Sequence, residues 1–342
     1  MSVPVPVRLE VLGVHGLDEI TAGADLAALV SSRLDLVAGD VVVITSKVVS
    51  KAAGQVVRGD RSALVAQHAT RDVARRGRTR IVRTVHGLTL AAGGLDSSNT
   101  EPGTVVLLPQ DPDTDAVRLR LRVQELTGLN VAVIVTDTAG RAWRHGQTDI
   151  AIGVAGLPPY VDLAGSPDSH GVLLAVTAPA VADEVAAAAD LVQGKTAGVP
   201  AAVVRGLAHL VLPRDDHGPG ARALVRPAAE DLFGLGAADA VRAATRRDDP
   251  AATAGFPRPD TAVADLVSDA LVACPAGMLD VRGLPGDVWE LSGSAGADPA
   301  MVVWELGALV ERLRALAVST RRALSLQRAG DAHWQVALHD DS

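Results

Sequence analysis

One segment of the chain places several polar side chains directly after a strongly apolar run. Residues 131–136, VAVIVT, predict a buried strand. The polar residues that follow it are Asp137, Thr138, Arg141, Arg144, His145 and Gln147. Carboxylate and hydroxyl oxygens can hold a divalent cation, and two nearby guanidinium groups can grip phosphate or carboxylate through paired hydrogen bonds. The pattern indicates a functional site, although an Asx-type turn with solvated arginines would use the same residues.

A second polar loop follows another short apolar run, at residues 88–92. Its sequence, AAGGLDSSN, contains Asp96 and Asn99 behind two glycines, which let a backbone approach a charged ligand closely. Two separate acidic loops are consistent with one shared metal site. Taken by itself, the DSSN motif would be an ordinary turn.

Lysine is rare in this chain, which carries most of its positive charge on arginine. Only Lys47, Lys51 and Lys195 occur among the 32 basic residues. Because arginine serves wherever a surface charge suffices, the three lysines suggest specific roles. Lys47 and Lys51 lie in TSKVVSK, after the predicted strand at 40–46, where ammonium groups beside hydroxyl donors could reach phosphate.

Lys195 lies in QGKTAG, after a predicted helix. The segment is not a Walker A loop, because position 189 is Ala rather than Gly and a helix rather than a strand precedes it. Gly194 is expected to end the helix. The loop could still fold over a nucleotide, with Lys195 offsetting the negative end of the helix dipole.

The composition limits the class of protein. The 342 residues are 48% apolar and carry a formal net charge of -8, which fits a globular protein and argues against a nucleic-acid binder. Cys274 is the only cysteine, so an intramolecular disulfide and a thiolate metal site are excluded. Neither a signal sequence nor a run of 18 apolar residues is visible. We expect a cytoplasmic protein without a membrane partner.

Short apolar strands alternate with helical patterns rich in Ala and Leu. The expected strands are 8–12, 40–46, 79–85, 87–92, 104–108, 131–136, 171–177 and 200–205. The expected helices are 23–34, 60–75, 115–127 and 181–193. Because two of the strands meet at His86-Gly87 like a hairpin, the pattern favours an α+β fold with a mixed sheet over a doubly wound parallel sheet.

Three regions are expected along the chain. A large domain occupies 1–245, a linker rich in Pro, Ala and charge occupies 246–260, and a small α/β domain occupies 261–342. In the small domain we expect helices at 261–274 and 299–317 and strands at 323–327 and 333–339. No catalytic constellation is visible in it, and its role stays open.

Six motifs in order connect the large domain to a known family. They are TSKVVSK, AGGLDSSNTEPG, LLPQDPD, VIVTDTAGRAWRHGQTDIAIGVAGL, AVADEVAAAADLVQGK and PAAVVRGL. Over about residues 8–245 the chain resembles the coenzyme F420-0:L-glutamate ligase family, with the actinobacterial two-domain members most similar. The resemblance implies a homodimer. It also implies that GTP and divalent cations are used to join L-glutamate to coenzyme F420-0, or its dehydro form, through a γ-linked amide.

The resemblance also implies roles for particular residues. Those expected to contact GTP are Leu17, Asp18, Glu19, Ile20, Ser46, Lys51, Asn99, Gln193, Gly194 and Lys195. Those expected to bind Mg²⁺ or Mn²⁺, as two ions with K⁺ as a further candidate, are Asp96, Asp137 and Thr138. The family's Gly-Leu-Pro-Glu turn reads Gly16-Leu17-Asp18-Glu19 here. A loop that carries an acidic metal ligand in some archaeal members reads Gln193-Gly194-Lys195.

The implied chemistry assigns catalytic roles as well. The γ-phosphate of GTP would activate the terminal carboxylate of the acceptor as an acyl phosphate, which the amine of glutamate then attacks. Arg141 and Arg144 are expected to orient the acceptor phosphodiester or the glutamate carboxylates. The base for the amine would be His145 or the pair Asp183 and Glu184.

Two other classes of function compete with the ligase. Paired acidic loops and arginines would equally serve a metal-dependent nucleotide or phosphoester hydrolase. A non-catalytic nucleotide-binding module would explain why the C-terminal residues carry no chemistry of their own. The tail after Asp248 is also too short for the flavin domain of the two-domain relatives, so we expect no flavin cofactor.

Overall fold

The structure is a computed structural model, and it describes residues 6, 8–98, 100–227, 230–231, 233–236, 239–241, 262–319, 322–330 and 333–340. The chain divides into two compact units, Met1–Arg226 and Pro227–Ser342. The expected linker at 246–260 lies outside the described residues.

A five-stranded mixed sheet forms the centre of the first unit. Its strands, in spatial order, are β1 (Glu10–Gly13), β10 (Ala201–Arg205), β2 (Val41–Thr45), β8 (Ala132–Gly140) and β9 (Gln147–Ala155). β2 and β8 are parallel, whereas the other neighbours are antiparallel. Val, Ile and Ala make β2 and the first half of β8 apolar on both faces, so this sheet needs cover on both sides. The expected α+β class with a mixed sheet is confirmed.

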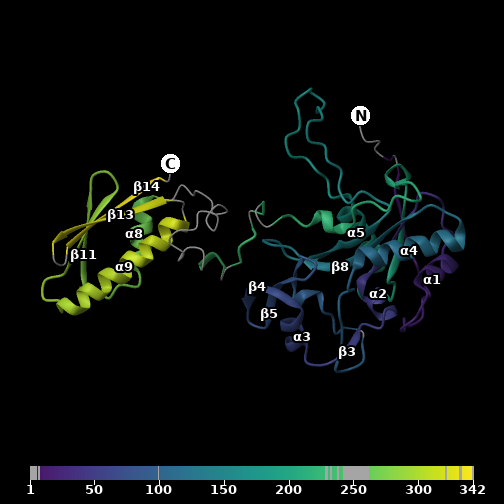
Figure 1. Cartoon of the computed structure of the whole chain (residues 1–342), viewed down its shortest axis with the longest axis horizontal. Helices are drawn as coiled ribbons and strands as arrows, with labels where there is room; N and C mark the ends of the chain where they lie inside the picture. Colours follow the sequence, from purple (N-terminus) through teal and green to yellow (C-terminus); the bar gives the residue numbers. More distant parts are fainter. Residues whose placement is uncertain are drawn as a thin grey trace. The chain divides into compact units, whose positions relative to one another are not determined.

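Helices cover the two faces of this sheet (Figure 1). Alternate side chains such as Val42 and Val133 pack with α1 (Leu26–Arg33) and α4 (Pro112–Thr127). Their neighbours Val41 and Ile134 pack on the opposite side with α5 (Val181–Gln193). This alternation follows from the two-residue period of a strand. The sequence also starts two of the helices, because the Asp25 and Asp111 carboxylates accept hydrogen bonds from backbone N–H groups in the first turns of α1 and α4.

A buried arginine ties α4 to a distant loop. The Arg120 side chain has no exposed surface, and it donates to the carbonyl oxygens of Val131 at 2.8 Å, Pro213 at 2.8 Å and Asp216 at 2.6 Å. Its guanidinium also lies against Gly156, where a Cβ would come within 2.3 Å of Nε. Gly156 has a φ of 75°, so it satisfies both a left-handed backbone and a close approach that another residue would not allow.

A smaller lobe of the first unit is inserted between β2 and α4. It begins with α2 (Ser46–Ala52) and continues through β3 (Val56–Arg58), α3 (Arg61–His68), β4 (Ala69–Arg76), β5 (Thr79–Thr84), β6 (Thr89–Ala91), the short 3-10 turn η1 (Ala92–Gly94) and β7 (Thr104–Val106). Strands β4, β5 and β6 form one antiparallel sheet, and β3 pairs with β7. Val65, Val82 and Val105 are buried together in its core.

Two sequence predictions in the first unit are wrong. The helix expected at 60–75 ends at His68, and residues 69–76 form β4 instead. The alternating exposure of ATRDVARR suits an edge strand, and pairing with β5 outweighs the local helical pattern. The strand expected at 171–177 is also absent from the described residues, since that segment is the returning limb of an irregular arm at 160–179 with a single isolated bridge, Pro167 to Leu173.

The arm leaves the main sheet after β9 and returns to α5. Gly165 N–H donates to Leu174 O, and Val161 N–H donates to Pro179 O, so the two limbs run side by side. Prolines lack the N–H groups that a regular ladder needs, and the limbs therefore stay irregular. Short 3-10 turns, η2 (Ala208–Leu210) and η3 (Ala221–Leu224), complete the unit.

The second unit contains its own core. Its strands are β11 (Leu279–Leu284), β12 (Val288–Gly293), β14 (His333–Asp340) and β13 (Arg322–Gly330), in that spatial order and all antiparallel. Helices α8 (Val263–Leu271) and α9 (Pro299–Ser319) pack Val267 and Leu309 against Leu291 of the sheet. The hairpin of β11 and β12 was not predicted from the sequence. Nowhere in the described ranges does a helix reach the length and apolarity needed to cross a membrane.

Candidate functional site

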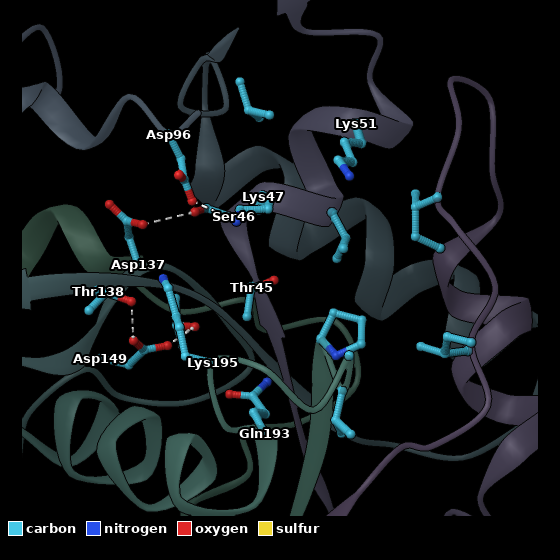
Figure 2. A pocket seen from close by; sticks show the side chains of 18 of the residues that line it. Thr45, Ser46, Lys47, Lys51, Asp96, Asp137, Thr138, Asp149, Gln193 and Lys195 are labelled. Atoms are coloured by element: carbon cyan, nitrogen blue, oxygen red, sulfur yellow. Dashed lines mark hydrogen bonds and ion pairs between the residues drawn. The ribbon is translucent and has the colours of Figure 1, made fainter. Parts of the chain in front are cut away.

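A polar cleft of about 250 Å³ opens beside the carboxyl ends of the parallel strands β2 and β8. This is the sheet edge where ligands bind in many α/β proteins, because several loops converge there. Figure 2 shows the cleft with β8, α2 and the end of α5 around it. Lys47, which the sequence suggested as a phosphate contact, also lines the cleft, and lining residues absent from the sequence prediction include Thr45, Thr136, Asp149 and Asp190.

Most of the predicted ligand-binding residues meet in this cleft. Those that line it are Leu17, Asp18, Glu19, Ile20, Ser46, Lys51, Asp96, Asp137, Thr138, Gln193, Gly194 and Lys195. They come from five segments that are far apart in the sequence. Asn99 lies outside the described residues.

The predicted catalytic residues lie elsewhere. Arg141, Arg144 and His145 are exposed on the loop that joins β8 to β9, and they do not line the cleft. The alternative bases, Asp183 and Glu184, lie in the first turn of α5 and also do not line it. One Asp183 carboxylate oxygen accepts a hydrogen bond from Ala151 N–H at 2.9 Å, which gives this side chain a structural contact between α5 and β9.

Asp96 is fixed by a lysine and by its own turn. Lys47 Nζ lies 2.6 Å from Asp96 Oδ2, and Ser98 N–H donates to Asp96 Oδ1 at 2.7 Å. Burial alone would raise the pKa of Asp96, but the hydrogen bonds from Lys47 and Ser98 outweigh it and hold the pKa below its usual value. Asp96 is therefore a carboxylate, and its single negative charge is paired with Lys47.

Asp137 has the most perturbed carboxyl group of the cleft. Burial raises its pKa to about 7, and the negative charges of Asp149 and Asp96 add to the rise. Ser46 Oγ donates to Asp137 Oδ1 at 3.3 Å, which opposes the shift only in part. Gly94 makes room for this carboxyl group, because a Cβ there would lie 2.9 Å from Asp137 Oδ2. A perturbed acid in a cleft is typical of a functional site.

Asp149 is a site residue that sequence reasoning missed. It is buried, and its carboxylate accepts hydrogen bonds from Thr136 Oγ1 at 2.8 Å and Thr138 Oγ1 at 2.9 Å. The antiparallel register of β8 and β9 places Asp149 opposite Thr138. Figure 2 shows this pair on one side of β8 and Asp137 on the other, as the two-residue period of a strand requires. The sequence feature that could have identified Asp149 is its position at the start of a second apolar run, which forms β9.

A lysine and a glutamate connect α2 to the loop at 17–20. Lys51 is buried on α2, and its Nζ lies 2.6 Å from Glu19 Oε1. The Glu19 side chain is largely exposed, so the pair is open to solvent on one side. A buried ammonium on this wall can interact with an anion that enters the cleft.

The end of α5 contributes a buried amide. Gln193 is 2% exposed, yet among the residues that the structure describes neither its Oε1 nor its Nε2 has a hydrogen-bond partner. A buried amide usually has partners, because leaving it unpaired costs about 1–3 kcal/mol. Gly194 ends α5 as expected, and Gln193 and Lys195 face the cleft together (Figure 2). The unpaired donor and acceptor of Gln193 point to a polar ligand at this wall.

The donor set is consistent with a cation such as Mg²⁺. Asp96, Asp137 and Asp149 all line the cleft, and the negative charges of Asp149 and Asp96 add to the rise that burial causes in the pKa of Asp137. In the part of the chain that the structure describes, no three His, Cys, Asp or Glu side chains lie close enough to form a complete metal cage. Mg²⁺ commonly binds through one or two carboxylates and completes its coordination with water and substrate phosphates. The residues therefore fit an ion that is held jointly with a phosphate-bearing ligand.

A cleft of carboxylates, lysines and a buried amide at the ends of parallel strands is typical of an enzyme active site. Comparison with known proteins identifies which enzymes these are. The family described as F420-0:Gamma-glutamyl ligase matches residues 16–76 and 60–206, more than half of the chain. The chain therefore belongs to the F420-0:gamma-glutamyl ligase family and is an enzyme of the ligase class, which forms carbon–nitrogen bonds.

Individual relatives support the same assignment. Coenzyme F420:L-glutamate ligase of Methanothermobacter thermautotrophicus is 38% identical over 251 residues, which cover 66% of this chain and 98% of the relative. The Archaeoglobus fulgidus enzyme of the same name is 40% identical over 222 residues, covering 59% of this chain and 89% of the relative. A third, from Methanopyrus kandleri, is 37% identical over 63% of this chain and 93% of the relative.

Proposed function

We propose that this chain joins L-glutamate to coenzyme F420-0, or to its dehydro form, through γ-linked amide bonds, with GTP and Mg²⁺ or Mn²⁺. One observation carries the proposal. The cleft brings together three of the segments expected to contact the nucleotide and all three residues expected to bind metal, although these segments are far apart in the sequence. Family membership and the names of the relatives support the same substrates.

The nucleotide would occupy the walls of the cleft. Leu17–Ile20, Ser46 and Lys51 form one side, and Gln193, Gly194 and Lys195 form another. Ammonium groups on Lys51 and Lys195 can interact with phosphate oxygens, and the Gln193 amide can satisfy both of its unpaired atoms on a ligand. GTP is proposed here because of the family resemblance.

Two divalent ions, with K⁺ as a further candidate, would bind between the nucleotide and β8. Asp96, Asp137 and Thr138 would hold them, and Asp149 is added here as a fourth contributor. Thr138 donates its hydroxyl hydrogen to Asp149, which leaves oxygen lone pairs available for an ion. Such ions stabilise the negative charge that develops during phosphoryl transfer.

The amide would form in two steps. A carboxylate oxygen of the acceptor attacks the γ-phosphorus of GTP, so that GDP leaves and an acyl phosphate forms. The amine of glutamate then attacks the acyl carbon, inorganic phosphate leaves, and a base accepts the proton that the amine loses. Arg141 and Arg144 would orient the acceptor phosphodiester or the glutamate carboxylates, and His145 or the pair Asp183 and Glu184 would be the base. The protein mainly positions the reactants.

A homodimer is part of the proposal. The arm exposes Val172, Leu173 and Val176, with Val176 91% exposed. Beside it, an apolar hollow of about 680 Å³ is lined by residues of the arm, α5 and the β10 end, including Leu163, Val185 and Leu207. Exposed apolar surface of this kind is typical of protein interfaces, and a two-fold axis would cover both copies at once. Light scattering should give the mass of a dimer for the wild type, and Val176→Asp should shift the protein toward the monomer. A monomeric wild type would refute the proposed dimer.

Mass spectrometry tests the ligase activity directly. Coenzyme F420-0 is incubated with the full chain, L-glutamate, Mn²⁺ and either GTP or ATP. We expect additions of glutamyl mass that require GTP, stop in EDTA and disappear in Asp137→Ala. The control Asp162→Ala removes a carboxylate from the exposed arm and should retain activity.

The same assay separates the alternatives. Nucleotide hydrolysis that proceeds without glutamate and adds no mass would indicate a hydrolase. Bound nucleotide without any turnover would indicate a binding module. Activity that survives in Asp137→Ala would refute the assigned metal site.

A further inference from the structure

The loop between β8 and β9 exposes a large aromatic side chain. Trp143 lies at its tip and is 83% exposed. The loop residues 141–146 and the first residue of β9, Gln147, are all exposed. Arg141, Arg144 and His145 lie close to Trp143 in the sequence. Aromatic residues combined with arginines are typical of surfaces that bind ligands with a flat ring and a negative charge.

Contacts within the loop and at its base fix the loop backbone. Arg141 Nη2 donates to His145 O at 2.8 Å, and Gly140 pairs with Gln147 at the last step of the β8–β9 ladder. Trp143 itself has a φ of 57°, in the left-handed region that residues with a large side chain rarely adopt. A strained backbone that presents an exposed indole is a feature more often kept for binding than for stability.

The loop also lies at a suitable distance from the cleft. Asp137 and Thr138 line the cleft on β8, and the same strand continues to Gly140 before the loop begins. Because a strand advances about 3.3 Å per residue, Gly140 lies about 10 Å beyond Asp137. A ligand that reaches both places must therefore be long, with an anionic group at one end and a surface suited to aromatic contact at the other.

We propose that Trp143 is the platform on which the deazaflavin ring of the acceptor stacks. The inference rests on the proposed function, whose acceptor carries a terminal carboxylate, a phosphodiester and a flat ring. With the carboxylate beside Asp137, the phosphodiester lies near Arg141 and Arg144, and the ring reaches Trp143. The order carboxylate, phosphodiester and ring then matches the order Asp137, Arg141 and Trp143 along the hairpin, and Arg144 follows Trp143. Trp143 is a specificity residue in this scheme, because it touches no reacting atom.

Steady-state kinetics with two substitutions test the platform. Stacking on an aromatic side chain contributes about 1–3 kcal/mol for a nucleic-acid base. We expect Trp143→Ala to raise the KM for the acceptor about tenfold or more, with the KM for GTP unchanged and kcat little altered. Trp143→Phe retains an aromatic face and should recover most of the loss. The control Trp304→Ala removes an exposed indole from the second unit and should leave both KM values unchanged.

A shortened acceptor makes the test specific to the ring. An analogue with the carboxylate and phosphodiester but no deazaflavin should show the same KM with wild type and Trp143→Ala. An unchanged KM for the full acceptor in Trp143→Ala would overturn the platform, and so would an equal rise in the KM for GTP. The proposed function fails separately, because in that case the wild-type chain itself adds no glutamate to the acceptor.

Discussion

Replacing Asp137 with asparagine should stabilise the metal-free protein at alkaline pH. In the folded chain the pKa of this carboxyl group is about 7, against an ordinary value of 3.8. The folded state therefore retains a proton that the unfolded state loses, and each pH unit between these two values lowers the free energy of unfolding by about 1.4 kcal/mol. Above pH 7 the total penalty for the buried charge reaches about 4 kcal/mol. Asparagine has the same shape, can still accept from Ser46 and carries no charge.

The size of the effect depends on pH in a predictable way. Between pH 5 and pH 8 the Asp137 carboxyl group of the folded wild type loses its proton, so the free energy of unfolding should fall by about 2.5 kcal/mol relative to Asp137→Asn. Comparing the two proteins cancels the contribution of the other titrating groups. The free energy of opening can be measured by amide hydrogen exchange at pH 5 and pH 8, in urea and with EDTA to remove metal. Peptides from β2 and β8 report on the core of the first unit alone, so the stability of the second unit does not affect the result.

A difference between the two proteins that is the same at both pH values would refute the reasoning, because burial would then not disfavour the charge. Added Mn²⁺ should reverse the order at pH 8, since only the wild type gains from an ion at this carboxylate. The control Asp162→Asn removes a carboxylate of the exposed arm and should show no such reversal.

Three further substitutions test other parts of the structure. Arg120→Met should lower the free energy of unfolding by about 4 kcal/mol, because several buried carbonyl oxygens lose their hydrogen-bond donor. A loss under about 1 kcal/mol in urea titrations would contradict this. Gln193→Ala should raise the KM for the nucleotide about tenfold without lowering the melting temperature, since its amide has no partner within the described part of the chain. Gly94→Ala should reduce kcat/KM strongly in the mass-spectrometric assay, because its Cβ would lie 2.8 Å from Leu108 and 2.9 Å from Asp137; wild-type kinetics would contradict this.

Several features of the fold could be predicted from the sequence because they depend on neighbouring residues. The apolar runs that became β2 and β8 can only be buried, and Gly194 ends α5 as its lack of a Cβ allows. The motifs with Asp96 and Asp137 were visible for the same reason, since a polar strand end is a local pattern. The local helical pattern gave the wrong prediction at residues 69–76, because pairing with β5 makes this segment a strand.

The composition of the cleft was decided only by the tertiary structure. Asp149 became a site residue because the β8–β9 register places it opposite Thr138, a relation that no spacing in the sequence specifies. The raised pKa of Asp137 arises from burial and from two carboxylates that separate segments bring near it. The burial of the Gln193 amide likewise depends on the segments that pack around it after folding. Sequence patterns thus determine which residues can do chemistry, whereas through-space contacts determine their charge, their partners and their accessibility.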